Sequence, residues 1–171
     1  MKQEQAFSKS ASTLKCALAG EVLRSFGSLR FPAIGRSMLP TIWAGDTLVV
    51  ESVVPSQVQI GEVVVVGRHG SLCAHRVIGM EADAETPRWI TQGDALPVPD
   101  PPVSENELMG RVSYVIHAGR LIPLPAELSA VERVTAKIVR RSVLAARALV
   151  FLDRLIPVRG KFVSGEVPCR G

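Results

Sequence analysis

A serine in a turn bounded by glycine and proline is the most informative chemical feature of this 171-residue chain. Ser37 lies in the segment Gly35–Thr41, where a turn can lift its hydroxyl out of regular backbone pairing and present it to a substrate. His75 follows in a strand-like segment, and Asp94 and Asp100 lie in a later loop. These residue types can supply a nucleophile, a general base and a group that orients the base.

The histidine suits the role of base at neutral pH. A serine hydroxyl is a weak nucleophile unless its proton is removed as it attacks. A neutral imidazole has a pKa of ~6.5, whereas a lysine at ~10.4 must be desolvated to serve as a base. General-base catalysis of this kind accelerates a reaction roughly 10²–10⁴-fold.

The middle of the chain predicts a mainly β fold of short antiparallel strands. Strand-like segments separated by turn residues lie at Arg30–Ile34, Thr47–Val54, Val63–Val66, Leu72–Ile78, Arg88–Thr91, Leu108–His117 and Arg120–Leu124. The run of four valines is typical of a strand that is buried on both faces. Alternation along the next strand places Cys73 and His75 on one face and Arg76 on the other, which indicates a structural role for Arg76.

Helical patterns flank this β region. Apolar spacing predicts an amphipathic helix over Ser12–Phe26 that ends at Gly27, after a frayed stretch of residues 1–10. A second helical pattern covers Ala126–Ile156. We therefore expect three regions, which are an N-terminal tail and helix (1–29), a β domain (30–125) and a basic helical C-terminal extension (126–171).

The positive charge of the chain is concentrated in the C-terminal extension. The net charge of +4 divides into −1 for residues 1–125, with eleven basic and twelve acidic residues, and +5 for residues 126–171, with nine and four. We expect no nucleic-acid partner for the part that holds Ser37 and His75. The basic helix could contact an anionic membrane surface, and the alternatives are a helix that packs on the sheet or one that forms a dimer.

The cysteines and the hydrophobic segments limit the classes of protein to which this chain can belong. The chain has three cysteines without metal-ligand or disulfide spacing, so we expect no metal or other cofactor, and Cys73 reads as a small buried apolar residue. No segment has the length of a signal-peptide core or of a membrane-spanning helix. The expected location is the cytoplasm, or the periphery of a membrane.

The serine, histidine and aspartate segments resemble the signal peptidase superfamily of serine proteases over residues 33–117. The matching segments are Ser37–Thr41 with Gly45 and Asp46, then Gly61–Val65, then His75–Gly79, and finally Gly93 and Asp94 with Asp100. The base position is occupied by His75, so the chain resembles the histidine branch, which includes the endoplasmic reticulum and archaeal enzymes. The resemblance implies a signal-peptidase-like catalytic β-sheet domain.

The resemblance also implies roles for individual residues. It makes Ser37 the nucleophile, His75 the base and Asp100 the orienting carboxylate, with Asp94 as the alternative, although side-chain to backbone hydrogen bonds within its loop suit Asp94 better. Many relatives place an oxyanion-stabilising serine two positions before the nucleophile, and this chain has Gly35 there.

Four further residues near these segments have less specific interpretations. Met38 either lines the cleft or packs in the core. Asp46 reads as a turn former, and His69 and His117 read as surface or structural histidines without partners.

The expected function is a serine endopeptidase that cleaves an extended peptide with small residues near the cleavage site. Signal peptidases usually carry a membrane anchor, and we expect none here, because no segment of this sequence has the length and apolar character of a spanning helix. One alternative is a catalytically silent peptide-binding module of the same fold, which Gly35 leaves open. The other alternative is a self-cleaving regulator, which is disfavoured because the related repressors pair a lysine base with a larger N-terminal domain.

Overall fold

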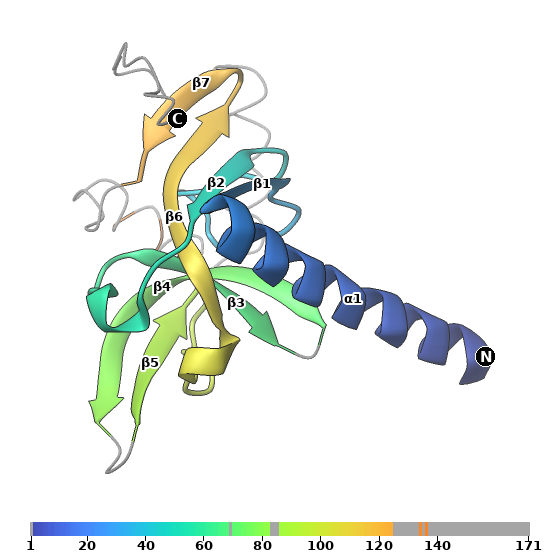
Figure 1. The fold of residues 1–171 in the computed structure, drawn as a ribbon. Helices are drawn as coiled ribbons and strands as arrows, with labels where there is room; N and C mark the ends of the chain where they lie inside the picture. The colour runs from blue at the N-terminus through green and yellow to red at the C-terminus, as the bar shows by residue number, and fades with distance from the viewer. Residues whose placement is uncertain (1, 69, 83–85, 125–133, 135, 137–171) are drawn as a thin grey trace.

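The structure, a computed structural model, describes residues 2–68, 70–82, 86–124, 134 and 136. An N-terminal helix, α1 (Lys2–Phe26), precedes an antiparallel seven-stranded sheet (Figure 1). The strands are β1 (Ser28–Pro32), β2 (Thr47–Glu51), β3 (Val63–Arg68), β4 (Ser71–Ala82), β5 (Pro87–Gln92), β6 (Leu108–His117) and β7 (Arg120–Pro123), with 3₁₀ turns η1 (Pro55–Gln57) and η2 (Glu105–Glu107). The mainly β prediction is confirmed. The predicted C-terminal helical extension lies, apart from residues 134 and 136, outside the described residues.

The strands are not ordered in the sheet as they are in the sequence. Their order is β1-β2-β6-β3-β4-β5, and β7 also pairs with β6. The long strand β6 therefore lies between β2 and β3, and Figure 1 shows it running through the middle of the molecule. In this order β6 and β3 lie between β2, which follows the serine loop, and the histidine strand β4.

Strand β3 joins two hydrophobic cores on opposite faces of the sheet. Val63 and Val65 belong to one core and Val64 and Val66 to the other, as the period of two along a strand requires. All four side chains are buried. Each fully buried valine contributes about 1.5–3 kcal/mol to the hydrophobic stabilisation. The predicted burial of this strand on both faces is confirmed.

Helix α1 begins earlier than the sequence pattern predicts. Its first residue is Lys2 rather than Ser12, because residues 2–11 contain no glycine or proline and are mostly good helix formers. It ends as predicted at Gly27, which has a φ of 71° and donates its N–H to the carbonyl of Leu23 at 2.9 Å. Leu23 is buried in the core that contains Val63, so the C-terminal part of α1 is anchored to the sheet.

Several strand boundaries differ from the predicted ones. Strand β1 begins two residues earlier than predicted, and β2 ends at Glu51 because Pro55 starts the turn η1. Strand β4 continues to Ala82 instead of ending at Ile78, because its pairing with β5 resumes after a register shift between Val77 and Gly79. An irregularity of this kind at a glycine is a β-bulge, which interrupts a ladder without ending it.

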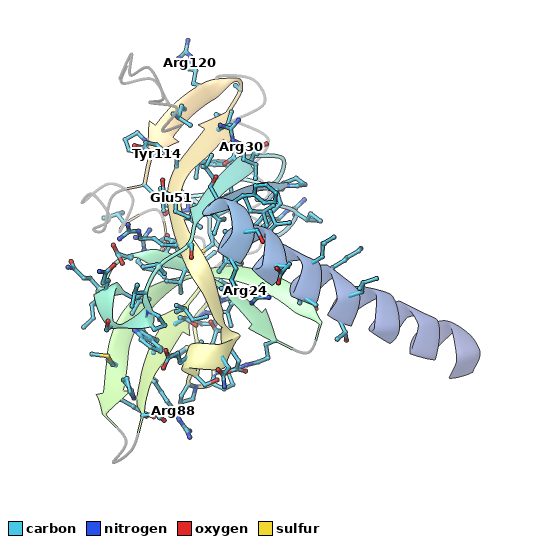
Figure 2. The ribbon with its side chains drawn as sticks, in the orientation of Figure 1. Arg24, Arg30, Glu51, Arg88, Tyr114 and Arg120 are labelled. Carbon is cyan, nitrogen blue, oxygen red and sulfur yellow. The ribbon has the colours of Figure 1, made fainter. Side chains whose placement is uncertain are left out.

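The surface of the described residues shows scattered basic side chains. The labelled arginines of Figure 2 come from four elements, α1, β1, β5 and β7, and lie well apart. Arg88 marks the far end of the β4–β5 hairpin, and Arg120 marks the tip of the β6–β7 hairpin. Within the described residues, no helix has the length and apolar character needed to cross a bilayer.

Candidate active site

The loop that carries Ser37 is closed at its base by backbone hydrogen bonds. Ala33 donates to the carbonyl of Asp46 at 2.7 Å, and Gly45 donates to the carbonyl of Ala33 at 2.8 Å. Met38 is buried in the core with Val63, so it packs beneath the turn. Ser37 itself is only partly buried. The loop is therefore anchored by apolar side chains while its serine remains accessible.

The structure places His75 directly against Ser37. His75 is buried, with 5% of its surface exposed, and its Nε2 atom lies 3.1 Å from Ser37 Oγ. The histidine occupies the middle of β4, opposite Val64 of β3, so its backbone is held on a rigid strand. A separation of this size allows the hydroxyl to donate its proton to the imidazole nitrogen.

Asp100 lies on the other side of the imidazole. Its Oδ2 atom is 2.5 Å from His75 Nδ1 and accepts a hydrogen bond from the Thr91 hydroxyl at 2.8 Å. The backbone N–H of Asp100 also donates to the carbonyl of Thr91 at 2.8 Å. Because an ionised carboxylate only accepts, Nδ1 carries the ring proton and Nε2 presents its lone pair to Ser37.

Asp94, the alternative orienting residue, has different partners. Its two carboxylate oxygens accept hydrogen bonds from Nε and Nη2 of Arg76, each at 2.9 Å, and Oδ2 also accepts one from the Thr41 hydroxyl. Arg76 also donates to the carbonyl of Gly61 at 2.6 Å. Both charged residues are buried. Asp94 thus ties the serine loop to β4 through side chains, and Arg76 has structural contacts, as predicted.

The loop after β5 also touches the nucleophile turn through its backbone. The N–H of Ala95 donates to the carbonyl of Ser37 at 2.8 Å, and the side chain of Gln92 donates to the carbonyl of Leu96 at 2.7 Å. A Cβ atom at Gly93 would lie 2.6 Å from the carbonyl oxygen of Ser37. Only glycine allows the two loops to approach this closely.

We expect Gly93→Ala to lower both stability and any activity that depends on Ser37. The added methyl group must push the Ser37 backbone away, at a cost of about 1–3 kcal/mol. A displacement of about 1 Å at a reacting group can cost roughly 10²-fold in rate. The matched control is Gly79→Ala, because its Cβ would meet nothing closer than Ile90 Cβ at 4.0 Å. Equal melting temperatures and rates for the two variants would contradict this account of Gly93.

Cys73 is a neighbour of the site that the sequence interpretation missed. Its Sγ atom lies 3.2 Å from His75 Nε2, and the residue is partly exposed rather than simply buried. Burial, followed by the negative charge of Asp100, raises the pKa of the Cys73 thiol to about 11. The group is therefore a protonated thiol at neutral pH, able to donate weakly to Nε2. The sequence could have indicated this contact, because positions 73 and 75 lie on the same face of the strand.

A second histidine–aspartate pair lies outside the candidate site. His117 Nδ1 is 2.5 Å from Asp46 Oδ1, and Asp46 Oδ2 accepts the backbone N–H of Trp43 at 2.7 Å. The prediction that Asp46 forms a turn is consistent with this contact, whereas the prediction that His117 has no partner is wrong. The two residues are 71 positions apart in the sequence, so no local pattern pairs them. His69 lies outside the described residues.

The arrangement brings together three of the predicted residues, Ser37, His75 and Asp100, in one chain of hydrogen-bonding contacts. In the part of the chain that the structure describes, no three histidine, cysteine, aspartate or glutamate residues are grouped to hold a metal ion. The chemistry that the contacts permit is removal of the serine proton by the imidazole as the hydroxyl attacks an electrophile.

Comparisons with models of protein families, with curated proteins and with solved structures gave no match.

Proposed function

We propose that this protein is a serine endopeptidase of the signal peptidase type, with Ser37 as nucleophile, His75 as general base and Asp100 as the residue that orients the base. The observation that carries the proposal is the contact of His75 with both partners, 3.1 Å to Ser37 Oγ and 2.5 Å to Asp100 Oδ2. The antiparallel β fold and the order of the segments are compatible with a signal-peptidase-like domain.

The proposed reaction follows from these contacts. Ser37 Oγ attacks the carbonyl carbon of the scissile peptide bond, and its proton moves to Nε2 of His75. The resulting imidazolium is stabilised by Asp100 and then gives the proton to the leaving amine. Water, activated by the same nitrogen, hydrolyses the acyl-enzyme and restores the Ser37 hydroxyl. The proposed substrate is an extended peptide with small residues near the cleavage site.

The negative charge on the substrate oxygen needs hydrogen-bond donors during attack. We assign the backbone N–H of Ser37 as one donor, because it belongs to the residue that attacks. Gly35 offers no side-chain donor, but it has room for one. A Cβ atom at this position would lie 3.9 Å from Ser37 Oγ and 4.0 Å from Ser37 N, which are ordinary contact distances.

We therefore expect Gly35→Ser to increase kcat for peptide hydrolysis by up to about 10²-fold. An added hydroxyl next to the nucleophile would stabilise the oxyanion, and one such donor is worth about 2.7–4 kcal/mol in a well-aligned site. Gly35→Ala is the matched control, since it adds the same Cβ without a donor. A rise that is equal in the two variants, or no rise in the serine variant, would refute the oxyanion assignment.

Peptide cleavage tests the proposal directly. The full chain is incubated with extended peptides that contain either small or bulky residues at one position, and the products are identified by mass spectrometry. We expect cleavage after the small residues with the native protein and none with Ser37→Ala. Binding of these peptides without cleavage would instead support a silent peptide-binding module, and fragments of the protein itself would support a self-cleaving regulator.

A further inference from the structure

Arg68, the last residue of β3, holds the loop that follows Asp100. Its guanidinium donates to the carbonyl of Pro102 at 2.7 Å and to the carbonyl of Pro101 at 3.2 Å. The same group binds Glu107 through two hydrogen bonds, Nε to Oε1 at 2.6 Å and Nη2 to Oε2 at 2.9 Å. One side chain therefore connects the end of β3 to the two residues that directly follow Asp100 and to the turn η2.

The hydrogen bonds from Arg68 are needed because of the two prolines. Proline has no backbone N–H, so Pro101 and Pro102 cannot donate to a strand ladder, and the backbone hydrogen bonds to β5 come from Asp100 and Val103 on either side of them. The carbonyl groups of the two prolines still require donors when they are partly removed from water. The planar guanidinium of Arg68 supplies several donors in fixed directions, which a single backbone N–H does not.

The far side of the loop is fixed by a second set of contacts. Glu107 Oε2 accepts hydrogen bonds from the backbone N–H and the hydroxyl of Ser104, both at 2.9 Å. Val103 pairs with Trp89 of β5 through two backbone hydrogen bonds, at 2.8 and 3.0 Å. On the near side, Asp100 is held by Thr91 and by its contact with Nδ1 of His75. Arg68 thus bridges the proline pair that lies between these two anchored points.

We propose that Arg68 is a positioning residue for Asp100, and through Asp100 for the imidazole of His75. The inference rests on the proposed function, because it concerns the same site. Arg68 fixes the carbonyls of Pro101 and Pro102, and this keeps the Asp100 carboxylate against Nδ1 of His75. Loss of the guanidinium frees the proline pair, and the carboxylate then spends less time against the ring.

A role in positioning and a role through charge alone predict opposite changes. The hydrogen bonds to Glu107 raise the pKa of the Arg68 guanidinium, and the charges of Glu107 and Asp100 add to this effect, so Arg68 is a cation that also senses Asp100. If Arg68 acted only as a charge, its removal would make a protonated His75 easier to form. If Arg68 positions Asp100, its removal takes away the partner of the imidazolium, and a protonated His75 becomes harder to form.

The test is titration of the histidine side chains by NMR in Arg68→Met, Arg68→Lys and the native protein. The resonances are assigned with His75→Gln and His117→Gln. We expect the titration midpoint of His75 to move to lower pH in Arg68→Met, because the imidazolium loses its carboxylate partner. A smaller move in the same direction is expected in Arg68→Lys, which retains the charge but loses the bidentate fork.

Arg111→Met is the matched control, because Arg111 forms a comparable ion pair with Glu62 at 2.8 Å and none of its described contacts reaches the loop of Asp100. We expect it to lower the melting temperature without moving the His75 midpoint. A midpoint that moves to higher pH in Arg68→Met, or one that does not move in either Arg68 variant, would overturn the proposal.

The titration needs no substrate, so it tests the role of Arg68 even if the protein cleaves no peptide. If peptides are cleaved, kcat should fall about 10- to 100-fold in Arg68→Met while KM changes little, since the proposed role of Arg68 is to position Asp100 and not to bind the substrate. An absence of cleavage with the expected NMR shift would reject the protease proposal alone. Cleavage without the shift would reject the positioning role alone.

Discussion

We expect His75→Gln to lower kcat/KM for peptide hydrolysis by about 10⁴-fold or more and to leave the fold in place. Glutamine approximates the size of the imidazole but cannot take a proton from Ser37 Oγ, which lies 3.1 Å from Nε2 in the native protein. General-base catalysis alone is worth roughly 10²–10⁴-fold, and the residues of a triad act as a unit. The check is a comparison of hydrolysis rates together with circular dichroism spectra of the two proteins.

His117→Gln is the matched control for this substitution. His117 is also paired with an aspartate, Asp46, at the same 2.5 Å that separates His75 from Asp100. The imidazole that contacts Ser37 Oγ is that of His75, so for His117→Gln we expect a loss of stability with an unchanged rate per folded molecule. A comparable loss of rate in both variants would show that general disturbance of the sheet, rather than removal of the base, explains the His75 result.

Asp100→Asn is expected to lower kcat about 10⁴-fold at nearly unchanged stability. The asparagine amide can donate to Nδ1, and this would place the ring proton on Nε2, where it faces Ser37 and cannot accept the serine proton. Because Asp100 is partly exposed and the Thr91 hydroxyl can accept the second N–H of the amide in place of donating to Oδ2, the fold should tolerate the change. The rate is measured with the same peptides, and stability is measured by urea unfolding.

Asp94→Asn is expected to have the opposite effects, with a large loss of stability and a small loss of rate. It leaves the buried guanidinium of Arg76 without its carboxylate partner, which typically costs about 3–5 kcal/mol of unfolding free energy. The rate per folded molecule should fall far less than in Asp100→Asn, because Asp94 binds Arg76 and Thr41 rather than the imidazole. An inactive but stable Asp94→Asn protein beside an active Asp100→Asn protein would reverse the two assignments.

The local features of the fold could be predicted because each has a local physical cause. The four valines of β3 indicate burial on both faces, and Gly27 marks the end of α1. Alternation along β4 separates His75 from Arg76, and the structure places their partners accordingly. Prolines around Asp100 exclude regular structure there, so the aspartate had to lie in a loop.

The long-range contacts could not be predicted in the same way. The pairs Asp46–His117 and Arg68–Glu107 depend on the insertion of β6 between β2 and β3, which no local pattern in the sequence shows. Register shifts in three strand pairs also change which residues oppose one another. For the same reason the sequence left two candidates, Asp94 and Asp100, for the contact with His75.

The most direct test of the central claim is the location of the adduct formed by a fluorophosphonate probe, which reacts with activated serines. Intact-mass and peptide mass spectrometry should show one adduct on Ser37 of the native protein, none on Ser37→Ala or on heat-denatured protein, and a strongly reduced yield on His75→Gln. An unlabelled native Ser37, or labelling that is equal in native and denatured protein, would contradict a working Ser37–His75–Asp100 site.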